Sequence, residues 1–321
     1  MTQSIGGYFE LPEREKGVFP HSKGILLNTG RNALEYILRS IGLVKKVYLP
    51  YYTCDAVLEP LQKLSIPVQR YQISSSLEIL ESIQPKEGEY IIANNYFGIK
   101  DDYVSRLSQE YNTSLIVDAA QALLSPVSIG IKAFYSPRKF VGVADGGIAY
   151  LGDNDNYISI EKTERTDEHD SHLTLRKRFG AEAGFMAFRE DERKLDRQPI
   201  RFMSKKTQDI LSHIEYQHIR KKRRDNFIIL HQALKDTNRI IIPDISVFTC
   251  PMIYPYLPSE RKDLRKKLIE HRIYVAQYWP NMALRNASSF ESVLAEELLA
   301  LPCDQRYGIK EMSFILECLR P

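Results

Sequence analysis

The 321-residue sequence predicts an α/β fold: a mostly parallel sheet flanked by helices, followed by a smaller C-terminal α+β domain. Short apolar runs rich in Val, Ile and Tyr alternate with amphipathic helical patterns, which is the order expected of βαβ units. The chain is also longer than a typical single hydrophobic core requires. Open sheets of this kind bind ligands at the carboxyl ends of their strands, so we look for functional residues there.

The N-terminal half contains the predicted strands, which are the apolar runs 46–50, 66–73, 90–95, 114–120, 131–136 and 146–152. The helical patterns "RNALEYILRSIG" and "DDYVSRLSQEY" lie between some of them. After about residue 152 a polar stretch precedes a helical pattern over 175–188, and the charged break 189–199 is the predicted linker. We therefore expect a large domain over 1–200, whose N-terminal segment packs on the small domain, and a small domain over 201–321.

The C-terminal part begins with one long helical pattern at about 205–236. Two strands are predicted at 239–244 and 248–257, then a helix near 259–271, and a closing strand at 298–302 is followed by a last helix.

Composition favours small-molecule chemistry. The net charge is only +3, which lacks the electrostatic signature of a nucleic-acid-binding protein, and the cationic run 220–224 is typical of a solvated helix face. The four cysteines and seven histidines show no metal-ligand spacing. No apolar stretch reaches the length of a membrane span and no leader pattern precedes the first strand, so we expect a cytoplasmic protein with reduced thiols.

Three segments carry candidate chemistry. In "LLNTGRNALEYIL" a strand-like run enters a helix at Gly30, Arg31 and Asn32. Free backbone N–H groups at such a helix start can hold a phosphate, and the Arg31 guanidinium adds a planar donor. The simpler interpretation of this segment alone is that Asn28 or Thr29 caps the helix.

The second segment is "SLIVDAAQAL", where Asp118 ends a buried apolar run. A buried carboxylate needs a partner, and a protonated heterocyclic nitrogen is one. An aspartate that caps the next helix is the equally simple alternative.

The third segment, "FYSPRKFVGVADGG", contains Ser136 three residues before Lys139. This spacing can place a hydroxyl and an amine on one side of a tight turn, one to hold a phosphate and the other to form a Schiff base, while the glycines leave room for a planar cofactor. Taken singly, Lys139 is most simply a surface lysine.

Together, "TGRNAL", "DAAQA" and "SPRKFVGVADGG" resemble the fold-type-I, pyridoxal-phosphate-dependent sugar aminotransferases of the DegT/StrS type. "YLPYYTCDAVLEPL", "NNYFG" and "ELLALPCDQRYG" extend the resemblance over nearly the whole chain. The resemblance implies a seven-stranded sheet and a phosphate site at Gly30, Arg31, Asn32 and Ser136. It also implies that Asp118 faces the cofactor's pyridine nitrogen, with Gln121 near the ring, and that Lys139 binds the cofactor covalently.

The implied reaction transfers an amino group from an amino-acid donor to a keto group, on a sugar or nucleotide sugar. A homodimer with shared active sites is implied as well, without nucleic-acid or membrane partners. Lys139 would act as the general acid/base at the substrate carbon. A related pyridoxal-phosphate lyase or dehydratase and a non-catalytic protein on the same scaffold are the alternatives; retention of Lys139 argues against the second.

The sequence departs from the family pattern at several positions. Arg31 stands where many members have threonine, and Cys54 replaces the aromatic residue that covers the ring, so Tyr52 is a candidate for that contact, as are Tyr51, Tyr96 and Phe97. Asn95 replaces a common histidine. Arg201 is the candidate to replace the asparagine that a neighbouring subunit usually contributes to the phosphate site.

Overall fold

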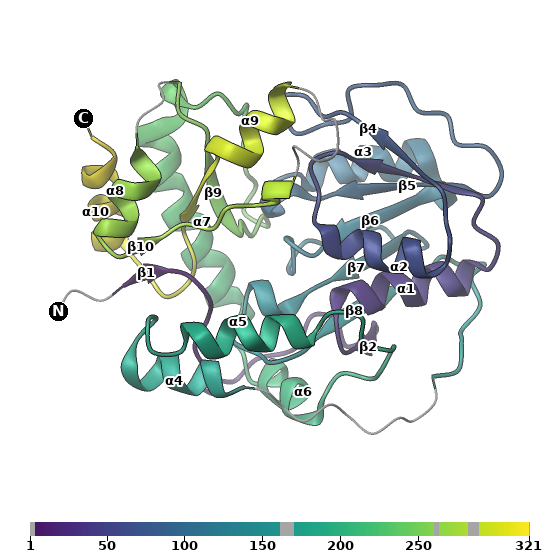
Figure 1. Ribbon diagram of the computed structural model, residues 1–321, viewed down its shortest axis with the longest axis horizontal. Coiled ribbons are helices and arrows are strands. Elements are labelled where there is room, and N and C mark those ends of the chain that lie inside the picture. Colours follow the sequence, from purple (N-terminus) through teal and green to yellow (C-terminus); the bar gives the residue numbers. More distant parts are fainter. Residues whose placement is uncertain (1–3, 161–169, 260–262, 282–288, 321) are drawn as a thin grey trace.

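The central sheet fills one side of the molecule in Figure 1, and the helical C-terminal part lies beside it. The computed structural model describes residues 4–160, 170–259, 263–281 and 289–320. The sheet has seven strands in the order β2-β8-β7-β6-β5-β3-β4. Their bounds are β2 (Ile25–Leu27), β3 (Lys46–Pro50), β4 (Val68–Tyr71), β5 (Glu89–Asn94), β6 (Leu115–Ala119), β7 (Lys132–Tyr135) and β8 (Gly147–Tyr150).

The strand directions confirm the predicted mostly parallel sheet. β4, β3, β5, β6 and β7 pair in parallel, whereas β8 runs antiparallel to both β7 and β2 at one edge. In the parallel register Asp118 lies between Asn94 of β5 and Phe134 of β7. The ends of the three central strands therefore meet at one edge of the sheet, where ligands of such folds bind.

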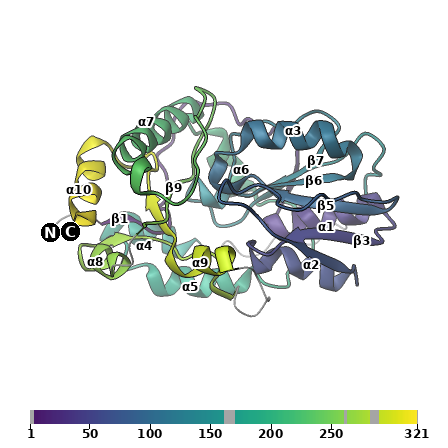
Figure 2. The same ribbon diagram turned by 90° about the horizontal axis from the view of Figure 1, so that it is seen from above.

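Helices cover both faces of the sheet, as Figure 2 shows. α1 (Gly30–Ile41) and α2 (Leu58–Lys63) lie on one face, and α3 (Asp101–Tyr111) lies on the other. α1 buries Leu34, Ile37 and Leu38, which recur at helical spacing and pack in one cluster with sheet residues such as Ile116. This packing fixes the start of α1 near the ends of the strands.

Two predicted helices are each divided in the structure. The pattern over 175–188 forms α4 (Ser171–Phe179) and α5 (Phe185–Lys194), because Gly180 ends α4 with a φ of +92°. The predicted linker over 189–199 was wrong in its first half, since α5 continues to Lys194. The pattern over 205–236 forms α6 (Lys205–Ser212) and α7 (Tyr216–Leu234), where the Glu215 side chain accepts bonds from the first turn of α7.

The C-terminal part contains two small sheets. β9 (Ile253–Tyr256) pairs antiparallel with β11 (Leu299–Pro302), and the N-terminal β1 (Ile5–Gly6) pairs in parallel with β10 (Ile273–Tyr274). α8 (Leu264–Glu270), α9 (Ser289–Glu297) and α10 (Ile309–Leu319) complete it. The strand predicted at 239–244 was wrong, because this segment forms no strand in the structure.

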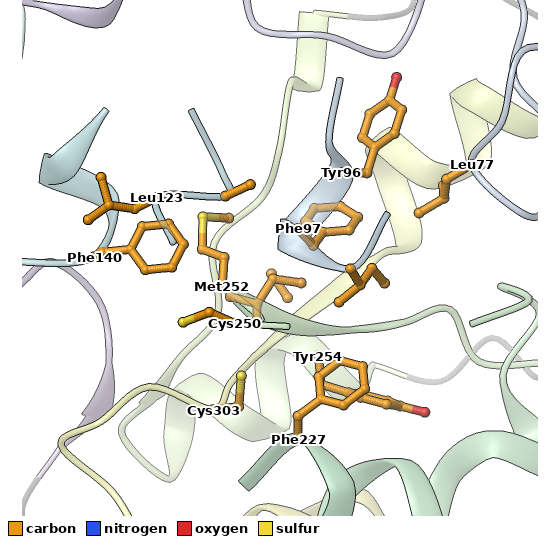
Figure 3. Close-up of a cluster of buried hydrophobic side chains, with 14 of the residues drawn as sticks. Leu77, Tyr96, Phe97, Leu123, Phe140, Phe227, Cys250, Met252, Tyr254 and Cys303 are labelled. Atoms are coloured by element: carbon orange, nitrogen blue, oxygen red, sulfur yellow. The ribbon is translucent and has the colours of Figure 1, made fainter. Parts of the chain in front are cut away.

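One hydrophobic cluster joins the sheet to the C-terminal part (Figure 3). Phe97, which follows β5, packs near Met252, and the Met252 N–H donates to the Phe97 carbonyl at 2.8 Å. Arg223 of the cationic run is fully buried rather than solvated, and its guanidinium donates to the carbonyls of Pro251 and Met252. The two parts therefore share a core and hold one fixed arrangement.

Among the residues described, no helix is long and apolar enough to cross a membrane. The same part of the chain contains no group of three His, Cys, Asp or Glu side chains that could hold a metal ion.

Candidate active site

Lys139 lies in a turn that follows β7 directly. Ser136 leaves the strand, and Pro137, Arg138 and Lys139 form one short 3-10 turn. Pro137 suits the first position of such a turn, and its carbonyl accepts bonds from the N–H groups of Phe140 and Val141, both at 2.9 Å. The turn places Lys139 at the edge of the sheet, beside the strand that carries Asp118.

Asp118 is a buried carboxyl at the end of β6. Its Oδ1 accepts a bond from the Ala120 N–H at 2.9 Å, and its Oδ2 has no hydrogen-bond partner within the described chain. Burial raises the pKa of Asp118 to about 6, although the Ala120 N–H and the positive charge of Lys139 both act to lower it. The carboxyl therefore caps the backbone with one oxygen and leaves the other for a cationic or N–H partner.

Two further buried polar groups near Asp118 each keep one atom without a partner among the described residues. The Gln121 Oε1 accepts a bond from the Phe97 N–H at 3.0 Å, but Nε2 is unsatisfied. The Asn94 Nδ2 donates to the Thr53 hydroxyl at 3.1 Å, but Oδ1 is unsatisfied. Buried polar atoms rarely stay unpaired, so this edge of the sheet suits a polar ligand. The donors and acceptors fit a charged heterocycle such as pyridoxal phosphate.

The start of α1 lies next to the Lys139 turn. The Thr29 hydroxyl caps the helix by accepting a bond from the Asn32 N–H at 3.1 Å, as the simpler interpretation held. A Cβ placed on Gly30 would lie 3.5 Å from the Cβ of Ser136, so these two predicted phosphate residues are neighbours. Contrary to the sequence prediction, Gly147 does not leave room for a cofactor but allows close packing of the backbone. A Cβ there would lie 2.0 Å from the Thr29 carbonyl oxygen.

The side chains of Arg31 and Asn32 are engaged within the chain. The Arg31 Nη1 donates to Glu59 at 2.8 Å and to Asp196 at 2.5 Å. The Asn32 Nδ2 donates to Asn28 and to the Pro199 carbonyl, both at 2.8 Å. In this arrangement two carboxylates offset the Arg31 charge, and α1 offers a phosphate only backbone N–H groups.

Tyr52 and Asn95 lie away from open space. The Tyr52 ring is fully buried, and its centroid is 4.5 Å from that of Trp279 in an edge-on contact. The Tyr52 hydroxyl is buried and meets no partner in the part of the chain that the structure describes, and burial raises its pKa well above the usual value. The Asn95 amide bonds to the Lys100 N–H and to Asp101, which ties it to the start of α3. Neither side chain reaches the cavity described next.

A cavity of about 670 Å³ opens beside the Lys139 turn. Lys139 and Ser136 line it, together with the N-terminal segment 6–9, α4, α5 and strands of the C-terminal part. Its walls include several aromatic rings: Tyr8, Phe9, Phe185, Phe188, Tyr274 and Tyr278. The Lys139 Nζ lies 5.9 Å from the Tyr278 ring centroid. The other predicted site residues do not line this cavity, whereas Lys139 both lines it and acts electrostatically on Asp118.

The cavity's arginines are paired. Arg138 donates to the Ala144 carbonyl at 3.0 Å and forms an ion pair with Glu192. Burial raises the pKa of Glu192, but the charges of Arg138 and Lys139 outweigh it and lower the pKa overall. Arg176 donates to Glu10 and to the Gly6 carbonyl, both at 2.8 Å. Sequence reasoning missed these pairs because their members come from separate segments.

Arg201 lies beside the start of α1 in its own chain. Its N–H donates to the Asn28 Oδ1 at 3.2 Å, and its carbonyl accepts a bond from the Asn28 N–H at 2.9 Å. The side-chain Nε is buried and has no partner among the described residues. The backbone of Arg201 is therefore held beside the residues that precede Gly30.

Comparisons with known proteins give the same fold. Sugar aminotransferase CalS13 from Micromonospora echinospora superposes with a TM-score of 0.63 at 15% identity, over 94% of this chain and 88% of that one. S. venezuelae DesV, in complex with a ketimine intermediate, superposes with a TM-score of 0.62 at 16% identity, over 92% of this chain and 84% of that one. 3-Amino-5-hydroxybenzoic acid synthase superposes with a TM-score of 0.61 at 14% identity, over 92% of this chain and 85% of that one. No family model and no curated protein matches the sequence. At these identities the similarity establishes the fold.

Proposed function

We propose that this chain is a pyridoxal-phosphate-dependent aminotransferase of the DegT/StrS type. The observation that carries the proposal is the placement of Lys139 at a cavity, within electrostatic range of the buried Asp118. Asp118 keeps one oxygen without a partner among the described residues, and Gln121 keeps an unpaired N–H group. A lysine that served only solubility would not need this arrangement.

The site residues have two roles, which are to hold the cofactor and to transfer a proton. Asp118, Gln121, Ser136 and the backbone N–H groups at Gly30 would hold the cofactor, and Lys139 would bind it covalently. When bound, the cofactor withdraws electrons from the carbon that carries the transferred amino group. Once the amine of the incoming donor has displaced it from the cofactor, the free Lys139 amine would remove and return the proton at that carbon as a general acid/base, and the aromatic walls of the cavity would exclude water.

The acceptor we propose is a sugar ketone. Apolar faces of sugar rings pack well on aromatic side chains, and the cavity is lined by such rings. A pyrophosphate would call for several available cations, whereas Arg138 and Arg176 are paired with carboxylates and Arg176 keeps only its Nη1 without a partner among the described residues. This favours a ketone without an attached nucleotide.

The test uses the purified protein mixed with pyridoxal phosphate. We expect a visible absorption band that borohydride bleaches, with the added mass located on the peptide that contains Lys139. Glutamate or another amino acid should then convert the band to that of the pyridoxamine form, and a keto sugar should restore it. A band that no amino acid converts would exclude the transaminase and leave the lyase alternative; absence of a band would exclude both.

We also propose a homodimer with shared active sites in the cytoplasm. Phe179, Phe185 and Met186 of α4 and α5 are substantially exposed apolar side chains, which suits contact with a second copy. All four cysteines are free thiols, in keeping with a reducing compartment.

Mixing two inactive variants, Lys139→Ala and Arg201→Ala, tests the shared site. The Arg201 backbone lies beside α1 of its own chain. A guanidinium that reaches the partner's site would let hybrid dimers regain activity, because one of their two sites would combine an intact lysine with the partner's arginine. A mixture that stays inactive while subunits exchange, or an active monomer in sedimentation, would rule out the shared site.

A further inference from the structure

A histidine and a carboxylate from different helices form a buried pair at the wall of the cavity. His172 comes from α4 and Asp191 from α5, and the His172 Nδ1 lies 2.7 Å from the Asp191 Oδ2. The two side chains are only 2% and 8% exposed. Lys194, one helical turn after Asp191, donates to its other oxygen at 3.3 Å. His172 lines the same cavity as Lys139.

The pair fixes how the imidazole is protonated. A carboxylate accepts hydrogen bonds, so Nδ1 carries the proton and the Nε2 of the neutral ring keeps its lone pair. Nε2 makes no hydrogen bond to any residue that the structure describes. A tie between two helices would require only Nδ1, so Nε2 is left as an acceptor for a ligand in the cavity.

Several charged groups act on this ring. Burial lowers the pKa of His172 below its usual value and outweighs the hydrogen bond and charge of Asp191, which raise it. Arg138 also lowers the pKa, whereas Glu192 raises it. From its own helix Arg176 faces the cavity, and the Tyr8 ring lies 5.9 Å from the imidazole, its hydroxyl donating to the Ala181 carbonyl. The ring is therefore neutral at pH 7.

We propose that His172 is a specificity-determining residue whose Nε2 accepts a hydrogen bond from a hydroxyl group of the keto substrate, and that Asp191 is the positioning residue that fixes the tautomer. This rests on the proposed aminotransferase function. The rings of Tyr8 and Phe188, whose centroids are 4.7 Å apart, pack beside the imidazole and supply a surface for the apolar face of a sugar. The substrate is thus a hydroxylated ketone that donates to the histidine.

The decisive variant is His172→Asn. The asparagine Nδ2 can replace Nδ1 as the donor to Asp191, so the tie between the helices persists, whereas the acceptor at the Nε2 position is lost. We expect conversion of the bound cofactor by glutamate to change less than about twofold. With a panel of keto-hexopyranoses, KM for the best acceptor should rise about tenfold, as expected for one lost hydrogen bond. One monodeoxy analogue should show no such rise.

His231→Asn is the matched control. His231 on α7 is half-buried and lies 3.4 Å from the Tyr254 hydroxyl, but it does not line the cavity. This variant should leave both half-reactions unchanged. If His172→Asn slowed both half-reactions equally, or if no keto-hexopyranose were accepted by a protein that glutamate converts, the proposal would be overturned.

A second measurement does not depend on the cofactor. ¹⁵N NMR of the protein as purified should show His172 with a protonated Nδ1 and a bare Nε2 at pH 7, and Asp191→Asn should shift the proton toward Nε2. A wild-type ring protonated at Nε2 would overturn the inference whether or not the protein proves to be an aminotransferase. Failure of the cofactor to bind would instead overturn the proposed function alone.

Discussion

The end of strand β6 and the wall formed by α4 and α5 differ in how their carboxylates are paired. At the strand end, Asp118 and Gln121 are buried, and each keeps one polar atom without a partner in the described chain. On the helical wall, Glu192 is paired with Arg138 of the Lys139 turn, and Asp191 with both His172 and Lys194. Both regions flank Lys139, which interacts electrostatically with Asp118 and with Glu192.

This difference indicates that the strand end binds a ligand, whereas the helical wall shapes the cavity. Unpaired buried polar atoms are costly for a protein alone, so their presence at the strand end points to a ligand that completes them. Paired charges on the helical wall are stable without a ligand, and they select what enters the cavity by position and shape. Substitutions at the strand end should therefore act on the cofactor, and substitutions on the wall should act on the substrate.

The largest expected effect is at Lys139, where the two regions meet. Lys139→Ala should abolish covalent attachment of pyridoxal phosphate and turnover, while thermal unfolding stays close to that of the wild type, because the side chain is used for chemistry rather than packing. Mass spectrometry after borohydride reduction measures attachment. Lys139→Arg is the control: it keeps the positive charge near Asp118 and Glu192 but should be equally inactive. Normal activity in either variant would refute the assignment.

Asp118 should come next. Asp118→Ala leaves the ligand at the strand end without its buried carboxylate, and we expect turnover to fall on the order of 10³-fold or more. Steady-state rates with saturating amino donor measure this. A loss below about tenfold would mean that Asp118 acts only by accepting the bond from the Ala120 N–H.

The stability of the cofactor-free protein should depend on pH through Asp118 at the strand end. The pKa of Asp118 is raised from 3.8 to about 6 in the folded protein, so the folded state binds the extra proton between these values. This carboxyl therefore favours folding most below pH 4, and its contribution falls as pH rises toward 6 and stays low above it. This difference between the folded and unfolded pKa values of Asp118 corresponds to roughly 3 kcal/mol in the free energy of unfolding.

Asp118→Asn removes this titration. Urea unfolding of the cofactor-free protein at pH 4 and pH 7 should show that the variant gains stability relative to the wild type as pH rises. If both proteins change equally between the two pH values, the Asp118 carboxyl does not titrate in this range.

The smallest effect is expected at Arg31. Its guanidinium joins α1 to Glu59 of α2 and to Asp196, so Arg31→Gln should lower the free energy of unfolding by about 1 kcal/mol. Cofactor affinity should change less than about threefold, because the phosphate would be held by backbone N–H groups at Gly30. Titration of the visible band measures affinity. A loss above about thirtyfold would show that the guanidinium leaves its carboxylates to bind phosphate.

Local patterns in the sequence predicted the sheet and its carboxyl edge. The strand over 46–50 and the helix over 101–111 have the predicted bounds, because apolar runs and helical periodicity act within a few residues. Asp118 falls at the end of its strand and Lys139 in the turn after β7 for the same reason. These positions follow from chain order once the strands align in parallel.

Tertiary structure alone decided the partners of the charged side chains. Arg31 of α1 meets Asp196 in the turn after α5 across 165 residues, and His172 meets Asp191 across 19, because packing of separate segments brings them together. The helical pattern over 175–188 divides at Gly180, whose left-handed backbone depends on how α4 and α5 pack. A charged side chain accepts any opposite charge within reach, and only the folded chain determines which one that is.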